Sequence, residues 1–343
     1  EIAQCLVGSE MCIRDSIKTD GLFGHNYAAG TTGEVVVTFL GTSQHFGNVL
    51  QDSGLEVFKE ALIKVDLTNA DAACPSGRWN NGFYKCVYLT EVVGSFAGKP
   101  NIKSCNAMFM NCWHLASIPP QMFRGCPRLE DAASCFEFDY QIQNVDYLFA
   151  DCPELRNISR VFYNSGAISA VGAFQNCPLA NTTAYCLAVC RRLTDVTDIF
   201  KGCTGITTLH ATFTECDLLN PPVNIFDDCK KAHYFAYLFR KLPGVTNESP
   251  YTVVNGQKVH LWERTAELGF TVPQTYDHCF SDSPTFADYA NIPEAWGGPP
   301  KTENNVKLRC WPMMAQIVAD PTTMTGVVSV SYTHLRAHET LSD

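Results

Sequence analysis

The residues of this chain that could do chemistry are its cysteines and histidines, 17 and nine of them in 343 residues. Together they could bind zinc, form disulfides, or supply a nucleophile and its base. No CxxC pair occurs, and no histidine has a second ligand three or four residues away within a known metal motif. His278 directly precedes Cys279, but adjacency supplies neither a positioned base nor an oxyanion site. We therefore expect no catalytic residue, no metal and no cofactor.

The common enzyme signatures GxGxxG, GxxxxGKS/T, GxSxG and HExxH are also missing from the sequence. The prediction is that the protein is not an enzyme. The minority hypothesis places chemistry within residues 240–279, in a pocket that would join His260, Glu263 or His278.

Most of the cysteines occupy one position of a short repeated unit: an aromatic residue, Cys three positions later, and Leu or Ile three positions further, roughly every 13 residues. Cys126, Cys152, Cys177, Cys203 and Cys229 follow one another at intervals of 26, 25, 26 and 26 residues. Stacked coils of this period would hold these side chains parallel and about 5 Å apart. Parallel Cβ vectors do not favour disulfides, so we expect buried thiols that act as small apolar residues, although the interval alone leaves the disulfide state open. The predicted inward-facing ladder comprises Phe109, Cys112, Phe123, Cys126, Phe149, Cys152, Phe174, Cys177, Phe200, Cys203, Phe213, Cys216, Phe226 and Cys229.

The elements that must position this ladder are short. Half of the units carry Pro before the aromatic residue, which predicts a short strand followed by one helical turn that points Phe and Cys inward. The residue after the aromatic is often polar, as at Arg124, Glu137 and Arg240, which predicts a solvent-facing position. Because one coil cannot bury its apolar edge alone, stacking of coils would create the core. The predicted fold class is an α/β repeat, a solenoid of coils of about 26 residues built from short strands and short helical turns.

The units FRGCPRLEDAASCF, FMNCWHLASIPPQMF and FKGCTGITTLHATF resemble the BspA-type leucine-rich repeats of bacterial surface proteins. The resemblance implies a leucine-rich-repeat-like solenoid over residues 62–239 and an interrupted terminal, capping repeat over 240–299, where Trp262, Phe280, Phe286 and Trp296 would cover the last apolar face. It also implies an extracellular location, on the surface of a Bacteroides-type gut bacterium or on a phage virion.

The remaining segments differ from the repeats. Residues 17–42, with His25, Tyr27 and Gly33 before an alternating strand, resemble the end of a PKD-type, immunoglobulin-like β-sandwich. Residues 43–61 read as a linker and entry segment, and 300–329 as a C-terminal tail. Leu6–Asp15 and Val330–Thr340 can be back-translated as complementary DNA strands, so we interpret residues 1–16 and 330–343 as translated sequencing adapter from a metagenomic assembly.

The formal net charge of −10 argues against a nucleic-acid partner, which would need a basic surface, and no segment is apolar over the length of a membrane span. We expect neither nucleic-acid binding nor direct membrane insertion. Protein and glycan ligands stay open.

Exposed aromatic side chains are the candidate binding residues. Tyr185 and Tyr237 are 52 residues, or two coils, apart and should face the same way, whereas Tyr147 holds the equivalent place in the other half of its coil. Trp113 and Tyr163 occupy positions that are polar in other units. The leading hypothesis is a surface-displayed, non-enzymatic binding or adhesion module that recognises a host protein, a glycan or a cell-envelope component. The alternative is a structural spacer or fibre-like component; a contiguous aromatic patch would favour binding and a uniformly polar exterior would favour the spacer.

Overall fold

The computed structural model describes residues 3–7, 11–15, 35–39 and 62–300 of the chain. The first three ranges form a sheet in the order β2-β1-β3, from strands β1 (Ala3–Val7), β2 (Met11–Asp15) and β3 (Val35–Phe39). Both pairings are antiparallel. The alternating pattern that predicted a strand near the end of the PKD-like segment coincides with β3. The rest of that segment, the linker and the tail after Pro300 lie outside the described residues, and the interpretation of the ends as translated adapter stays a prediction.

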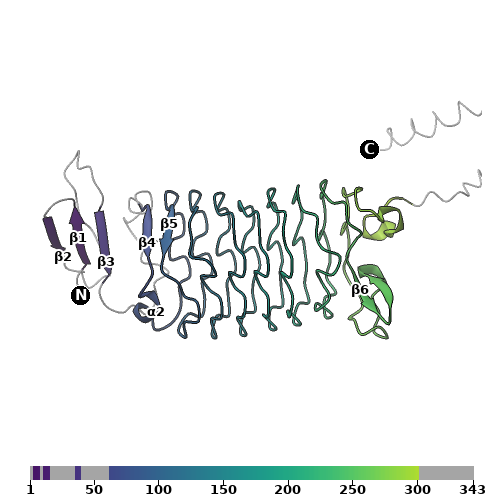
Figure 1. Cartoon of the computed structure of the whole chain (residues 1–343), viewed down its shortest axis with the longest axis horizontal. Coiled ribbons are helices and arrows are strands. Elements are labelled where there is room, and N and C mark those ends of the chain that lie inside the picture. Colours follow the sequence, from purple (N-terminus) through teal and green to yellow (C-terminus); the bar gives the residue numbers. More distant parts are fainter. Residues whose placement is uncertain (1–2, 8–10, 16–34, 40–61, 301–343) are drawn as a thin grey trace, which may run out of the picture. The chain divides into compact units, whose positions relative to one another are not determined.

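From residue 62 onward the backbone winds into stacked coils, each of about 26 residues (Figure 1). The stack begins where β4 (Lys64–Asp66) pairs in parallel with β5 (Glu91–Val93), next to the short helix α2 (Ala70–Ala73). Single parallel bridges then continue from coil to coil in two series. The first joins Arg78, Ser104, Asp131, Asn157, Thr182, Thr208, Tyr234 and Thr275, and the second joins Asn144, Ser169 and Asp195.

The segments that carry the repeated aromatic residues are chains of β-turns, so the prediction of a helical turn at this place was wrong. The N–H of Cys105 donates to Asp131 O and that of Ala107 to Ala133 O in the next coil, whereas the N–H of Met108 closes a turn on Cys105 O. Alternate amides therefore bond along the stack instead of along a helix. This path requires left-handed residues, and Ala107 has a φ of 50°. The arrangement satisfies the backbone through the neighbouring coil, which a helical turn could not do.

Left-handed residues recur at the same place in successive coils. One such column contains Asn81, Ala107, Ser134, Arg160, Tyr185, Ala211, Tyr237 and His278, all with φ between 49° and 59°. Only glycine, asparagine and aspartate adopt this conformation with ease. Tyrosine at two positions of the column is therefore a conformational cost that the local backbone does not explain.

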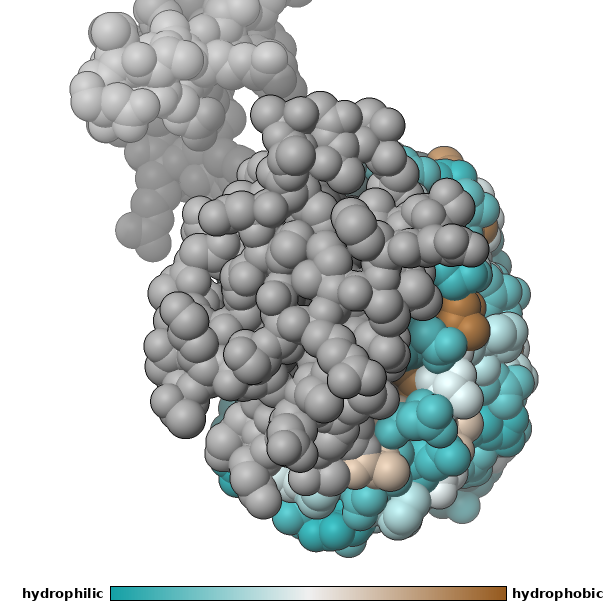
Figure 2. All heavy atoms as spheres, turned by 90° about the vertical axis from the view of Figure 1, so that its left-hand side faces the viewer, coloured by the Kyte–Doolittle hydropathy of each residue, from teal (hydrophilic) through white to brown (hydrophobic). Residues whose placement is uncertain are grey.

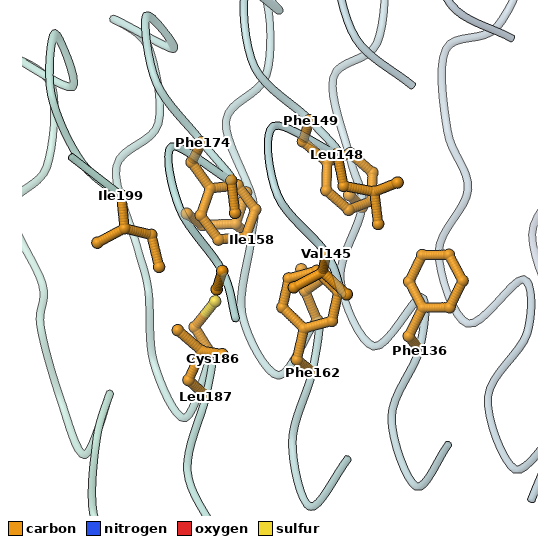
Figure 3. Packing of buried hydrophobic residues seen from close by; sticks show 14 of the residues in the cluster. Phe136, Val145, Leu148, Phe149, Ile158, Phe162, Phe174, Cys186, Leu187 and Ile199 are labelled. Atoms are coloured by element: carbon orange, nitrogen blue, oxygen red, sulfur yellow. The ribbon is translucent and has the colours of Figure 1, made fainter. Parts of the chain in front are cut away.

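The interior is filled by two stacks of phenylalanine rings, shown in part in Figure 3. Phe136 and Phe162 belong to one stack, and Phe149 and Phe174 to the other; rings of adjacent coils within a stack lie 5.9 and 5.8 Å apart, respectively. Edge-to-face contacts join the stacks, as between Phe136 and Phe149 at 6.4 Å. Burial of these rings and of the aliphatic residues beside them stabilises each coil against the next.

The regular stack ends at an insertion. The amide of Tyr237 bonds to Asp277 O, so the coils adjoin across 40 residues of sequence instead of 26. The residues between them form a hairpin of β6 (Tyr251–Val254) and β7 (Gln257–His260), followed by the 3₁₀ turn η1 (Leu261–Glu263). Two further 3₁₀ turns follow, η2 (Tyr289–Asn291) and η3 (Glu294–Trp296).

Aromatic residues cover the end of the interior. Phe280 stacks on Phe239 at 5.6 Å, Phe286 contacts Phe280 edge-to-face, and Trp296 stacks on Tyr276 at 4.6 Å. Arg264, only 2% exposed, donates to the carbonyls of Phe226 and Cys229, which face the end of the stack. Its guanidinium takes the place that donors from a following coil would hold.

Candidate functional site

All members of the predicted Phe and Cys ladder are buried, none more than 2% exposed. The fourteen cysteines among the described residues are buried thiols. Each ladder thiol lies against the preceding coil, and in several coils it donates to the carbonyl of the aromatic residue there, as Cys177 Sγ does to Phe149 O at 3.1 Å. The same bond joins Cys112 to Phe83, Cys126 to Phe96, Cys152 to Phe123, Cys190 to Phe162 and Cys203 to Phe174. The cysteine is thus a hydrogen-bond donor between coils, a role that the sequence argument, which treated it as a small apolar residue, did not include.

The environment of these thiols opposes ionisation. Burial raises the pKa of Cys203 to about 12 and that of Cys190 to about 11, and desolvation raises the pKa values of Cys112, Cys177 and Cys216 well above the ordinary range. A thiol that stays protonated is neither a nucleophile nor a metal ligand. In the described part of the chain, no three Cys, His, Asp or Glu side chains are grouped so that they could hold a metal ion.

One ladder position carries a carboxyl group. Asp139 stands three residues after Phe136 and is fully buried, with Oδ1 accepting the amide of Cys112 at 2.8 Å. Its Oδ2 is buried and has no hydrogen-bond partner. Desolvation raises the pKa of Asp139 well above its ordinary value, so the carboxyl group is held in a place suited to the neutral form. The sequence argument missed it because Asp139 falls outside the Cys pattern.

The exterior of one face carries a row of aromatic rings, one from each of six successive coils. Adjacent ring centroids lie 5.5, 6.2, 4.9, 5.8 and 5.3 Å apart. We call this set the aromatic row; in order along the stack it consists of Phe138, Tyr163, Tyr185, His210, Tyr237 and His278. Its members are half-buried apart from His278, which is exposed. The row joins three of the predicted binding residues, Tyr163, Tyr185 and Tyr237, into one surface.

His210 links the two tyrosines that the sequence predicted to face the same way. Its Nε2 lies 3.0 Å from Tyr185 Oη, and its ring meets the face or edge of both Tyr185 and Tyr237. The coil between the tyrosines has only Ala211 in their column, and His210 fills the gap from the preceding position. Desolvation lowers the pKa of His210, which favours the neutral ring at neutral pH. Sequence analysis weighed this histidine only as a metal or catalytic residue.

A buried ion pair fixes the start of the row. Glu137 is 1% exposed, and both its oxygens accept from Arg160, with Nε at 3.1 and 3.0 Å. The prediction that Glu137 faces solvent was therefore wrong: the side chain turns under Arg160 and is covered by it. The guanidinium carbon of Arg160 lies 4.2 Å from the centre of the Tyr163 ring and 5.9 Å from that of Tyr185. Glu137 thereby holds Arg160 in a cation–π contact with both tyrosines.

Polar hollows lie at the far end of the row. One, of about 390 Å³, is lined by His278, Ser281, Tyr289 and the carboxylates of Asp277, Asp282 and Glu294. A second, of about 330 Å³, shares Asp282 and contains paired charges, among them Arg191 with Glu215 at 2.9 Å and Lys241 with Glu215 at 3.0 Å. The surface next to the rings is thus rich in hydroxyl and carboxylate groups.

The other two predicted binding residues lie apart from the row. Tyr147 is in the opposite half of its coil, below Arg124 and against Gly172. Trp113 is 45% exposed near the start of the stack, where its Nε1 donates to Asn111 Oδ1, and neither residue has a ring contact with a member of the row. The part of the exterior that Figure 2 shows in colour is mostly hydrophilic with isolated hydrophobic side chains.

The residues named for the enzyme hypothesis are divided between two places. His260 lies in the insertion, with Nε2 3.6 Å from Asp288 Oδ2 and Nδ1 3.9 Å from Glu263 Oε2. His278 lies in the aromatic row and bonds to Ser281 Oγ at 3.1 Å. Desolvation lowers the pKa of His260, although the two carboxylates act in the opposite direction.

Within the described residues, no helix has the length and apolar character needed to cross a membrane. Comparisons with protein-family models, curated proteins and solved structures found no significant match.

Proposed function

We propose that this protein is a non-enzymatic binding or adhesion module of the BspA-like leucine-rich-repeat type, displayed on a bacterial surface or a phage virion, that recognises a protein or glycan on a cell surface. The aromatic row is its recognition site. The proposal rests on one observation above the others, the continuity of the row over six coils.

The row is hard to explain by folding alone. Tyr185 and Tyr237 adopt φ values of 56° and 59°, where asparagine or glycine would be less strained. Their rings stay half-buried on the surface instead of joining the phenylalanine stacks. A spacer needs only the interior and a polar exterior, whereas aromatic rings gathered with an arginine are typical of binding surfaces.

The test is binding of the full chain to arrayed host glycoproteins and glycans and to intact gut bacterial cells. The matched variant replaces Tyr185 and Tyr237 by asparagine, which removes both rings and suits the left-handed backbone, so the variant should fold. We expect the wild type to bind and the double variant to lose about 90% of the bound signal, since each aromatic contact contributes about 0.5–1.5 kcal/mol.

Tyr147→Asn is the control, because Tyr147 is also a half-buried tyrosine in a left-handed position, with a φ of 53°, but lies outside the row. It should bind as the wild type does. Binding that survives loss of both row tyrosines would remove the row as the site. A folded chain that binds none of the probes would favour the structural spacer.

A further inference from the structure

We propose that the ligand of the aromatic row is an uncharged, linear oligosaccharide that runs along the stack with one sugar unit for each coil. The inference rests on the proposed function and narrows its ligand from proteins and glycans to one chemical class. The juxtaposition of evenly spaced rings, hydroxyl and carboxylate groups and already-paired cations carries it.

The spacing of the rings matches a chain of sugar rings better than an extended peptide. All five intervals in the row lie between 4.9 and 6.2 Å, because one ring comes from each coil. An extended polypeptide presents side chains of one face about 6.6 Å apart, which exceeds every interval and would lose register within a few residues. A linear glycan advances by about the length of one pyranose ring per unit, which is comparable with the separation of the coils.

The chemistry of the row also suits a sugar chain. The faces of tyrosine and phenylalanine rings carry partial negative charge, and the C–H groups on the flat side of a pyranose carry partial positive charge. Tyr163, Tyr185 and Tyr237 are half-buried, so they present a low, narrow ridge and not protruding side chains that a protein pocket could enclose. A protein interface would instead be expected to centre on aromatic anchors in an apolar, fully desolvated patch.

Polar groups beside the rings can satisfy sugar hydroxyls. At the end of the row, Asp277, Asp282 and Glu294 offer acceptors in the hollow of about 390 Å³, with the Ser281 hydroxyl and the exposed ring of His278 beside them. A carboxylate accepts two hydroxyl hydrogen bonds, one at each oxygen, which is the arrangement that adjacent hydroxyls of a pyranose require. The hollow thus continues the row as a place for the last sugar units.

The charges near the row select a neutral glycan. Arg160 is paired with Glu137, and Arg240, which lies 5.9 Å from the centre of the Tyr237 ring, is 3.6 Å from Asp282. An anionic glycan would have to compete with these pairs and would meet Asp277, Asp282 and Glu294 at the end of the row. A sugar without charge meets neither cost.

The experiment titrates the full chain with cello- and chito-oligosaccharides from the disaccharide to the octasaccharide, and with heparin and hyaluronan fragments of matched lengths, by isothermal calorimetry. Affinity for at least one neutral series should rise with each added unit until the chain spans the row, and then level off. The Tyr185→Asn/Tyr237→Asn variant should bind the hexasaccharide roughly tenfold more weakly, and Tyr147→Asn should stay within about a factor of two. Circular dichroism of each variant shows whether it is folded.

Several results would overturn the inference: tighter binding of the anionic series, affinity that does not depend on length, or a neutral series that binds the row variant unchanged. Cells separate its failure from failure of the proposed function. If whole-cell binding needs Tyr185 and Tyr237 but survives removal of surface glycans by periodate and is abolished by protease, the protein is an adhesion module for a polypeptide and the oligosaccharide inference is wrong. Loss on periodate treatment and resistance to protease would support it.

Discussion

Each coil has two halves that share an interior and differ in their exterior. The first half carries the stack that includes Phe109, Phe136, Phe162 and Phe213, and the second half carries the stack of Phe123, Phe149, Phe174, Phe200 and Phe226. Thiols bond to the preceding coil in both halves, as Cys216 does to Leu187 and Cys203 to Phe174. The aromatic row belongs to the first half alone. Since the same interior forms with and without the row, the folding of a coil does not require it.

The left-handed column of the second half sharpens the contrast. It contains Gln121, Tyr147, Gly172 and Asp198, a single tyrosine among small or polar residues. Its counterpart in the first half contains Arg160, Tyr185, Tyr237 and His278. Two columns under the same backbone constraint have therefore filled with different chemistry, which indicates that something other than stability acts on the first.

The largest effect tests whether the two interiors are equivalent. Phe200→Ala in the second half and Phe213→Ala in the first remove rings that are no more than 1% exposed. Each should lower the free energy of unfolding by about 3–5 kcal/mol, the cost of truncating a core aromatic residue. Urea denaturation followed by circular dichroism measures it. A loss under about 0.5 kcal/mol at either position would contradict the shared interior.

Asp139 breaks the symmetry of the two ladders. Because its pKa is raised from the ordinary value of 3.8, both folded and unfolded states are protonated below about pH 4 and the residue has no pH-dependent cost there. As the pH rises above this value the unfolded state loses its proton first, so the free energy of unfolding falls until the folded carboxyl group also ionises.

Asp139→Asn should remove this fall and make the protein more stable at pH 7, by about 1–3 kcal/mol, the range for a buried polar group without a partner. At pH 3.5 the two proteins should be nearly equal. Urea denaturation at a series of pH values provides the comparison, and a variant less stable than the wild type at pH 7 would show that the carboxylate has a stabilising partner.

The thiol donors give a smaller effect, which should be alike in both halves. Cys203→Ala and Cys216→Ala remove the donors to Phe174 O and Leu187 O and should each cost about 1–3 kcal/mol. Serine should restore part of the loss, because Ser283 already bonds to Phe239 O at 2.6 Å in the last coil. Alanine and serine variants of equal stability would show that the bond contributes nothing.

The smallest effect is the reactivity of the thiols. Replacement of Cys5, Cys12 and Cys310 by serine leaves the fourteen cysteines that are buried. Their raised pKa values and burial should prevent labelling by Ellman's reagent at pH 8 in the native protein, while denaturant exposes all of them. Rapid labelling of one native thiol would locate a half-coil that opens more readily than the others.

Much of the interior could be predicted from residue types and intervals. Phe200 and Cys203, with their partners one coil away, recur at nearly constant spacing, and a periodic apolar pattern has few ways to be buried other than by stacking. The assignment to BspA-type leucine-rich repeats stays a prediction. The turn conformation was missed because helical turns and chains of β-turns place residues three positions apart on one side alike, and only the direction of the amide bonds distinguishes them.

The candidate site was predicted only in part. Tyr185 and Tyr237 were expected to face the same way because they are two periods apart. His210 and Arg160 were missed, although the column of left-handed residues places Arg160 one coil before Tyr185. Glu137 was assigned to the wrong side, since a polar residue after an aromatic gives no sign that an arginine from the next coil will cover it.

By itself, the sequence determined which residues form the interior and the period at which they return, because burial of apolar side chains depends on their type and spacing. Tertiary structure decided which surface residues meet. Phe138 and His278 are 140 positions apart, yet they are the ends of one row, because stacking brings residues of different coils within contact and the insertion after Phe239 leaves the last coil in register. It also decided that a thiol donates to a carbonyl in the preceding coil, since a hydrogen bond depends on the placement of both partners and not on the identity of one.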